Sequence, residues 1–310
     1  MVTNKVLNPV NINERNSRII PFEFEYYEPR TLEEAVDILH ELGDEAKVIA
    51  GGTDLLVKMK TGQVHPRVVV NIKKIPGLRY IREEGDYIRI GALTTLRDLE
   101  KHEVVMRHLP ALYDAVKKMA SIQVRTVATL AGNLCNASPA ADTAPPLLVY
   151  DPVIVAVGPS GERQIPLREF FLGPGKTVLK PWEIVKEVVI PKAKSGYSAF
   201  VKISRTSVDI AIASSAVYLD VKEDVISEAR IAVGSVAPVP LRAVKTETRL
   251  RGLRMGSTEV MIALQGLDEE ISPITDVRAT AEYRRHVAKV LVWDALHLAY
   301  SRYRERVINQ

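Results

Sequence analysis

The amino-acid sequence predicts an α+β fold: two α/β units at residues 21–75 and 76–191, then a C-terminal domain at 196–306 of antiparallel sheet plus helices. Three observations support this prediction. Strand and helix patterns alternate near the N-terminus, and strand-like runs separated by polar turns fill residues 199–233. A long amphipathic segment then closes the chain, and no internal repeat or heptad pattern interrupts this order.

Composition narrows the class of protein. The chain has 310 residues, of which 46% are hydrophobic and 26% charged, as in an ordinary globular protein of two or three domains. Its single cysteine, Cys135, excludes an internal disulfide and an iron–sulfur cluster, which needs about four thiolates. The histidines lack metal-site spacing, and we expect no metal site and no membrane span. The polar N-terminus lacks the apolar core of a secretory signal, which favours a cytoplasmic location.

The first α/β unit is predicted from alternating patterns. Residues 1–20 show no period and are predicted to be an N-terminal extension. Apolar and polar residues alternate over Pro21–Tyr27, which indicates a strand. Thr31 with Glu34 three residues later is typical of a capping box at the start of a helix, and Gly43 is suited to end that helix. Two further strands with a short helix between them complete a β-α-β-α-β order.

The stretch Lys47–Lys60 is the most informative part of this unit. An apolar strand leads into Gly51-Gly52, and a short helix follows from Leu55. Glycines let a ligand approach the main chain, and the N–H groups that open a helix attract anions such as phosphate. An ordinary strand–turn–helix corner, with Thr53 or Asp54 as N-cap, is the alternative that this stretch alone leaves open.

The second unit contains short strands at Leu78–Arg82 and Tyr87–Ile90, a helix opened by Thr94 or Thr95, and a helix at Ala111–Ala120. Strands are predicted within Leu147–Val157 and again before Pro191.

Between these elements, Val127–Asp142 is rich in small residues and low in charge. We therefore predict a ligand-contacting loop rather than a packed core element, with Thr129, Asn133 and Ser138 as hydrogen-bonding groups.

The C-terminal domain is predicted to contain strands at Ala199–Lys202, Ala211–Asp220 and Glu228–Val233, followed by helices at Thr258–Leu264 and Arg278–Arg304. The last segment holds a basic excess that matches the whole chain's net charge of +4. Because the rest of the chain is balanced, nucleic-acid binding is not expected. The basic helix suits either an acidic partner protein or simple solvation.

Familiar catalytic patterns are missing. The dinucleotide motif G-x-G-x-x-G, the phosphate loop and the G-x-S-x-G elbow are absent. Cys135 is either a small packed residue or, without an evident histidine partner, a less favoured nucleophile. Two glycine-containing segments in adjacent units, with no catalytic residues of the chain's own, favour a large cofactor held between the units.

Five segments match the motifs of one family in order: AGGTDLLVKMK (50–60), TLAGNLCNASPAAD (129–142), KISRTSVDIAIASSAV (202–217), ARIAVGSVAPVPLRA (229–243) and ITDVRATAEYRRHV (274–287). Over residues 21–305 the sequence resembles the FAD-binding medium subunits of molybdenum hydroxylases, of the carbon monoxide dehydrogenase and 4-hydroxybenzoyl-CoA reductase type, and the flavin domain of xanthine oxidase. Ala131 departs from the family, which usually has glycine there. The single cysteine also excludes the extra [4Fe–4S] cluster of the benzoyl-CoA reductase branch.

This resemblance implies two PCMH-type FAD-binding subdomains and a set of cofactor contacts. The loop Val48–Leu55 would hold the pyrophosphate, and the loop Thr129–Asn133 would hold the phosphate and ribityl side. Asp142 would form a hydrogen bond with the sugar portion. Met119, Val185 and Lys202 would lie near the flavin. The implied cofactor-binding residues are Val48, Ile49, Ala50, Gly51, Gly52, Thr53, Asp54, Leu55, Met119, Thr129, Leu130, Ala131, Gly132, Asn133, Asp142, Val185 and Lys202.

Physical chemistry qualifies three of these roles. A carboxylate beside phosphates is repelled, so Asp54 is expected to cap the helix or point toward the ribose, while Thr53 faces the phosphates. Without the family resemblance, Asp142 would be interpreted as the N-cap of a helix and Lys202 as a surface charge. A side chain at Gly51 or Gly52 is expected to displace the pyrophosphate without disturbing the fold.

The resemblance also implies a function. The chain would be an oxidoreductase subunit whose FAD receives electrons from two [2Fe–2S] clusters of a small subunit, while a large subunit oxidises substrate at a molybdopterin cofactor. A dimer of heterotrimers is the implied assembly. A flavin-free structural homologue is the alternative, and a stand-alone flavin oxidase is a less favoured third.

Overall fold

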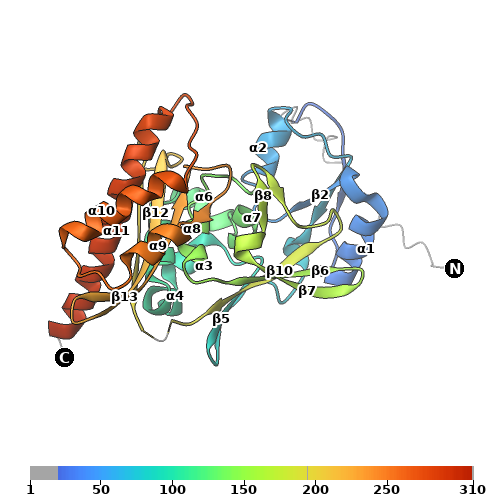
Figure 1. Cartoon of the computed structure of the whole chain (residues 1–310). Coiled ribbons are helices and arrows are strands. Elements are labelled where there is room, and N and C mark those ends of the chain that lie inside the picture. Colours follow the sequence, from blue (N-terminus) through green and yellow to red (C-terminus); the bar gives the residue numbers. More distant parts are fainter. Residues whose placement is uncertain (1–19, 194, 309–310) are drawn as a thin grey trace.

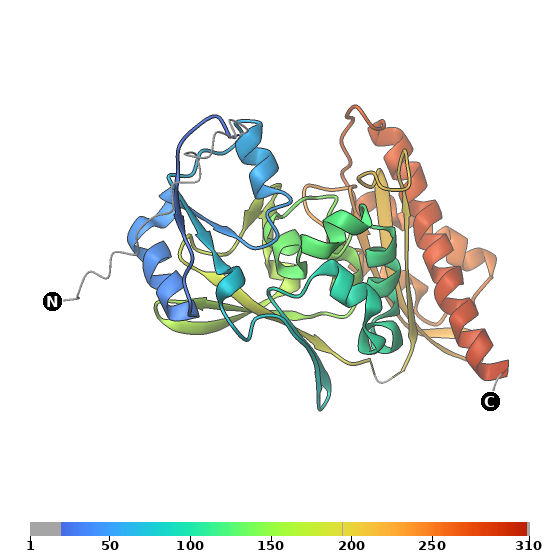
Figure 2. The same ribbon diagram turned by 180° about the vertical axis from the view of Figure 1, so that it is seen from behind.

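The computed structural model describes residues 20–193 and 195–308. The extension predicted at residues 1–20 therefore lies almost entirely outside the described residues. Figures 1 and 2 show the N-terminal unit and the C-terminal helices at opposite ends of the molecule, with the middle unit between them. The arrangement confirms the predicted α+β fold.

The N-terminal unit is a three-stranded parallel sheet in the order β1-β3-β2, with two helices in its connections. The elements are β1 (Glu25–Tyr27), α1 (Leu32–Leu42), β2 (Ala46–Ile49), α2 (Leu55–Lys60) and β3 (Val68–Asn71). The β-α-β-α-β order is as predicted, although the strand expected over 21–27 is only three residues long. Thr31 accepts from the Glu34 N–H, as predicted, but the Glu34 carboxylate accepts from the Arg30 N–H, so only half of the capping box forms.

The middle unit is built on a five-stranded antiparallel sheet in the order β4-β5-β10-β6-β7. Its strands are β4 (Ile81–Glu84), β5 (Tyr87–Gly91), β6 (Val153–Gly158), β7 (Gly161–Pro166) and β10 (Ile184–Pro191), with a separate small hairpin of β8 (Phe171–Gly173) and β9 (Lys176–Thr177). The β4–β5 hairpin protrudes from the body of the molecule (Figure 2).

Six helices of the middle unit separate this sheet from the C-terminal domain. They are α3 (Leu96–Lys101), α4 (Glu103–His108), α5 (Pro110–Lys118), α6 (Ile122–Val127), α7 (Leu130–Cys135) and α8 (Ala144–Leu148). Thr95 opens α3 with a complete capping box that pairs it with Asp98. Together with the sheet, these helices enclose the largest apolar core within the described part of the chain.

Two predictions for this unit are wrong. Residues 127–142 are not an irregular loop, because α7 forms within them and buries Leu130 and Leu134 in the core. Small residues permitted this close packing, and the Thr129 hydroxyl caps the helix by accepting from the Gly132 N–H at 3.0 Å. The strand expected from Leu147 begins only at Val153, since Pro145 in the first turn of α8 favours a helix.

The C-terminal domain is a four-stranded antiparallel sheet in the order β11-β12-β13-β14. Its elements are β11 (Tyr197–Ile203), β12 (Ala213–Lys222), β13 (Val225–Gly234), β14 (Leu241–Arg242), α9 (Val244–Leu250), α10 (Thr258–Gln265) and α11 (Ala281–Ile308). Side chains of β12 alternate between two cores: Ala216 and Tyr218 face the middle unit, while Val217 and Leu219 face the C-terminal helices. This sheet therefore joins the middle unit to α11.

Ion pairs within the chain engage much of the basic C-terminal segment. Lys289 contacts Asp268 at 2.8 Å, Arg302 contacts Asp114 at 2.9 Å, and Arg284 is buried against Asp276. The positive charge on α11 thus has intramolecular partners as well as solvent. No helix in the described part of the chain is long and apolar enough to cross a membrane.

Candidate functional site

The first wall of the site is the corner between β2 and α2. The parallel ladder of β2 with β3 ends at Ile49, and the chain then turns through Gly51-Gly52, where Gly52 has φ +76°. The Leu56 N–H donates to the Gly52 carbonyl at 3.1 Å and so starts the helix. The N–H groups of Thr53 and Asp54 donate to no acceptor among the described residues. These donors are available to an anionic ligand.

The second wall is the start of α7. Its N-cap Thr129 is fixed from both sides, since the Leu96 N–H donates to the Ala128 carbonyl and the Leu130 N–H donates to the Thr94 carbonyl. The Asn133 amide oxygen accepts from the Thr143 hydroxyl at 2.6 Å. Local hydrogen bonds therefore hold this wall in place before any ligand binds.

The two walls touch at Gly51. A Cβ atom built on Gly51 would lie 2.3 Å from the Val127 carbonyl oxygen and 2.9 Å from the Ala128 Cα atom. Such distances are far below ordinary van der Waals contact, so only glycine permits this approach. The expectation that a side chain at Gly51 would spare the fold is wrong, because that side chain would meet the backbone of the second wall.

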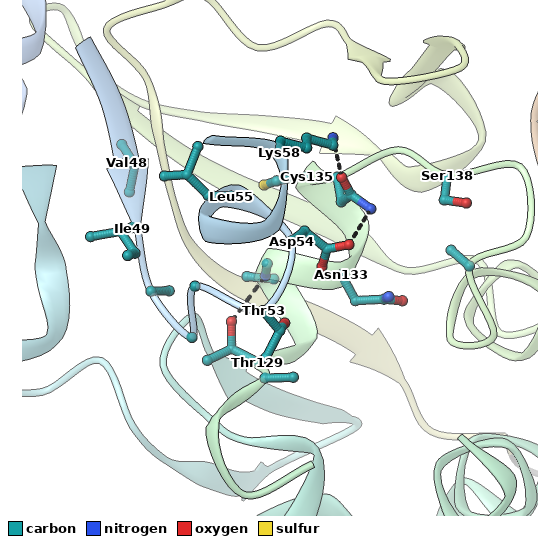
Figure 3. Close-up of a pocket in the computed structure, with 18 of the residues that line it drawn as sticks. Val48, Ile49, Thr53, Asp54, Leu55, Lys58, Thr129, Asn133, Cys135 and Ser138 are labelled. Atoms are coloured by element: carbon teal, nitrogen blue, oxygen red, sulfur yellow. Dashed lines mark hydrogen bonds between the residues drawn. The ribbon is translucent and has the colours of Figure 1, made fainter. Parts of the chain in front are cut away.

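Between the walls lies a cavity of about 730 Å³. Cofactor pockets typically have about 300–1,000 Å³, so a dinucleotide-sized ligand is in range. Figure 3 shows the labelled side chains of both walls around it. The predicted residues that line it are Val48, Ile49, Ala50, Gly51, Gly52, Thr53, Asp54, Leu55, Met119, Thr129, Ala131, Gly132, Asn133, Asp142 and Val185.

Two predicted residues do not line the cavity. Leu130 is fully buried in the core of the middle unit, on the inner side of α7. Lys202 lies behind the cavity wall, where its ammonium contacts Oδ2 of the lining residue Asp142 at 2.7 Å. Leu130 thus supports the wall, and Lys202 acts on the cavity through Asp142.

The Asp142–Lys202 pair is the main buried charge of the site. The two side chains are 7% and 3% exposed, so neither the surface charge nor the N-cap considered from sequence is correct. Burial raises the pKa of Asp142, and the positive charge of Lys202 opposes this shift. Oδ1 of Asp142 is buried without a hydrogen-bond partner among the described residues. An unpaired buried oxygen is costly, and a ligand hydroxyl in the cavity would remove that cost.

Asp54 does not cap α2. It occupies the N-cap position, but its side chain makes no capping hydrogen bond. Its Oδ1 instead accepts from the Asn136 amide at 2.9 Å (Figure 3). The expectation that Asp54 caps the helix is therefore wrong.

Cys135 faces the cavity rather than the core, so the expectation of a small packed residue is wrong. Protein atoms nevertheless surround the sulfur on most sides, and this burial raises the pKa of the thiol to about 12. The thiol is protonated near neutral pH, which does not suit a nucleophile.

Sequence reasoning missed several lining residues. Lys58 and Asn136 line the cavity and contact each other at 2.6 Å. Val208, Asp209 and Ile210 reach it from the loop between β11 and β12 in the C-terminal domain. The motif segments 50–60, 129–142 and 202–217 contain all five of these residues, so reading each motif to its end would have found them.

A loop on the far side of the cavity is held by a buried arginine. Arg125 donates to the carbonyl oxygens of Met119 and Ala120 at 2.7 and 2.8 Å and contacts Glu100 at 3.0 Å. Ala120 has φ +46°, an unusual conformation for a residue with a side chain, which these bonds stabilise. The position of Met119 at the cavity thus depends on Arg125.

The arrangement fits a large, partly apolar, phosphate-bearing cofactor. The N–H donors of Thr53 and Asp54 lie on one wall of the cavity, and the apolar side chains of Met119 and Val185 line another part of it. The buried Oδ1 of Asp142, which has no partner among the described residues, is suited to accept a hydrogen bond from a sugar hydroxyl. Among the described residues, no group of three or more His, Cys, Asp or Glu side chains could hold a metal ion. Fold and cavity together define a protein that binds a large, phosphate-bearing cofactor between two subdomains.

Comparison with known proteins agrees with a cofactor-binding role for this cavity. Residues 22–193 match the model of the FAD binding domain in molybdopterin dehydrogenase, and residues 198–299 match the CO dehydrogenase flavoprotein C-terminal domain. The chain is 35% identical to the carbon monoxide dehydrogenase medium chain of Hydrogenophaga pseudoflava, covering 92% of this chain and 99% of that one. It is 32% identical to a putative xanthine dehydrogenase FAD-binding subunit of Escherichia coli, covering 87% and 94%.

A solved structure of carbon monoxide dehydrogenase from Hydrogenophaga pseudoflava, lacking the Mo-pyranopterin moiety of its cofactor, superposes with a TM-score of 0.87 at 36% identity. The match covers 90% of this chain and 98% of that one. The chain belongs to the family of FAD-binding medium subunits of molybdenum hydroxylases, and the resemblance predicted from its motifs is confirmed.

Proposed function

We propose that this chain is the electron-transfer subunit of a heterotrimeric molybdenum hydroxylase, with FAD held in the cavity between α2 and α7. The observation that carries the proposal is the buried Oδ1 of Asp142, which has no hydrogen-bond partner within residues 20–193 and 195–308 and lies at a cavity walled by two small-residue segments. Residues 21–75 and 76–191 would act as the two FAD-binding subdomains, and 196–306 would supply Lys202 and the loop at 208–210.

The residues of the cavity divide into three roles in this proposal. The N–H groups of the segment Val48–Leu55 bind the pyrophosphate, and the segment Thr129–Asn133 closes over the phosphate and ribityl side. Asp142 accepts a hydrogen bond from a sugar hydroxyl through Oδ1, while Lys202 keeps that carboxylate oriented through Oδ2.

Apolar contacts position the ring portion of the cofactor. Met119, held by Arg125 through its carbonyl, and Val185 on β10 present apolar surface to the cavity. These contacts exclude water from one side of the cofactor and fix its orientation.

Bound FAD supplies redox chemistry, since it can accept electrons singly and pass them on singly or in pairs. In this role the chain receives electrons from two [2Fe–2S] clusters of a small subunit and passes them to an external acceptor. A large subunit with a molybdopterin cofactor oxidises the substrate. A dimer of heterotrimers in the cytoplasm is the assembly that we propose. No side chain of this chain need act as an acid or base on the substrate.

The proposal is tested on the native complex. Affinity capture of this chain should recover two companion chains together with molybdenum, iron and FAD. When FAD is stripped, substrate should still reduce the iron–sulfur clusters, but turnover with an external acceptor should stop. A chain captured alone, without molybdenum or iron, would contradict the subunit role.

A further inference from the structure

The two walls of the cavity are joined by a side-chain bridge at their outer ends. Asp54 and Lys58, both labelled in Figure 3, lie one turn apart at α2. Both contact Asn136 at the C-cap of α7. The Lys58 ammonium donates to Oδ1 of Asn136 at 2.6 Å, and Nδ2 of Asn136 donates to Oδ1 of Asp54 at 2.9 Å. We call these three residues the Asn136 bridge.

The chemistry of the bridge requires an amide. A residue spacing of four on a helix would let Asp54 and Lys58 pair with each other. Asn136 instead places its acceptor against the cation and its donor against the anion, so both charges are satisfied across the gap between the units. A carboxylate or a hydrocarbon at position 136 cannot do both. The backbone of Asn136 is fixed, since its N–H donates to the Gly132 carbonyl at 3.0 Å.

The bridge lies beyond a close contact between the same two walls. That contact is the approach of Gly51 to Val127, which involves backbone atoms at the base of α2, whereas the two units pack together elsewhere where α1 meets β6. Figure 3 shows Thr53 and Thr129 near this base and Lys58 further along α2, with Asp54 between. Asp54, Lys58 and Asn136 all line the cavity. Separating α2 from α7 at this end would widen the cavity while leaving the Gly51 contact in place.

From this geometry we infer that the Asn136 bridge controls the exchange of FAD: it holds α2 against α7 and must break before the cofactor leaves. The inference rests on the proposed FAD site. Asn136, Asp54 and Lys58 are then positioning residues that act through the spacing of the two walls. Two hydrogen bonds to partly exposed charged groups correspond to an effect of about tenfold on the rate of FAD release.

The bridge can be broken by one substitution and rebuilt by a second one that restores the original net charge. Asn136→Asp places a carboxylate against Asp54 and removes the donor, so FAD release should accelerate about tenfold. Adding Asp54→Asn to that variant supplies an amide donor on the other side, while Lys58 keeps an acceptor. This swapped pair carries the same charge as the original chain, and its release rate should return to within about twofold of the original. Lys60→Ala, on an exposed position of α2, is the matched control.

The test is the exchange of bound FAD for isotope-labelled FAD, followed by mass spectrometry of the protein-bound fraction. Faster exchange in Asn136→Asp that is restored in the swapped pair supports the bridge. An unchanged rate of FAD exchange in Asn136→Asp overturns the bridge, and so does a faster rate that the swapped pair does not restore. In either case, retention of FAD by the original chain leaves the proposed function standing.

Hydrogen exchange of the cofactor-free chain separates failure of the bridge from failure of the proposed function. If the original chain holds no FAD, the proposed function fails, but amide exchange in α2 and α7 still reports on the bridge. It should speed up in Asn136→Asp and slow down again in the swapped pair. Equal exchange rates in all three proteins would overturn the bridge independently of the flavin.

Discussion

The Lys202 ammonium lies 2.7 Å from Oδ2 of Asp142, and this ion pair joins β11 of the C-terminal domain to the wall of the cavity. Because both side chains are almost fully buried, water cannot solvate either charge if its partner is removed. Among the residues that the structure describes, Oδ1 of Asp142 has no hydrogen-bond partner. One carboxylate therefore serves the connection between domains and, in our proposal, the cofactor.

Removal of the Asp142 carboxylate should affect stability and FAD binding together. Asp142→Ala leaves the buried Lys202 ammonium without a counter-charge, with only the Asp209 carbonyl oxygen at 3.3 Å as acceptor. This should lower the free energy of unfolding of the cofactor-free chain by about 3 kcal/mol. The lost hydrogen bond to the cofactor should weaken FAD by a further ~1–3 kcal/mol. Urea unfolding without FAD and titration with FAD measure the two effects separately.

A double variant serves as the control for that experiment. Asp142→Leu with Lys202→Met replaces the pair by apolar side chains, so most of the stability should return while FAD affinity stays low. Recovery of both properties would show that Asp142 does not contact the cofactor.

Gly51→Ala should destabilise the chain itself. The new methyl group would meet the Val127 carbonyl oxygen, so the two walls must separate, at a cost of about 1–3 kcal/mol in the free energy of unfolding. Gly173→Ala is the matched control, because a Cβ there meets no atom within 4 Å. Thermal unfolding of both cofactor-free variants checks this prediction, and equal midpoints would refute the close contact.

Cys135 should react slowly with alkylating agents. Its pKa is raised to about 12 by the surrounding protein, so the thiolate is scarce near neutral pH and the rate should climb steeply only in strongly alkaline solution. Because Cys135 is the single cysteine, the mass shift after iodoacetamide treatment identifies the site without ambiguity. Rapid labelling at pH 7 that levels off near pH 9 would indicate an ordinary, solvated thiol.

The variant Ala131→Gly tests whether alanine, in place of the family's usual glycine, removes flavin binding. Ala131 lies in α7, is 5% exposed and lines the cavity. Ala131→Gly should cost up to about 1 kcal/mol of helix stability and change FAD affinity by less than about tenfold. Calorimetric titration of both proteins with FAD provides the comparison. Binding that appears only in the glycine variant would favour the flavin-free homologue instead.

Local patterns predicted most of the fold. The β-α-β-α-β order of the first unit, the capping residue Thr31 and the three long C-terminal strands follow from periodicity and capping that a single segment carries. The sequence left Thr94 and Thr95 as alternative caps, and the structure selects Thr95. Short helices were the main failure, as in α7 and α8. Their small or proline-containing sequences lack a helical stripe, and tertiary packing in the core decides their structure.

The sequence predicted the two segments that form the walls of the candidate site, but not the side-chain pairs that connect them. Segments around Gly51 and Thr129 were recognisable because glycine and capping patterns are local. The pairing of Lys202 with Asp142, and of Asn136 with residues of α2, joins positions 60 to 82 residues apart. Such contacts depend on how the three units pack, which no spacing within one segment reveals.

The central claim is that the cavity between α2 and α7 holds FAD. The most direct measurement is the flavin content of the purified chain after incubation with FAD and gel filtration. We predict about one FAD per chain, with absorption bands near roughly 370 and 450 nm that remain with the protein. Protein fractions free of flavin after this reconstitution would contradict the account.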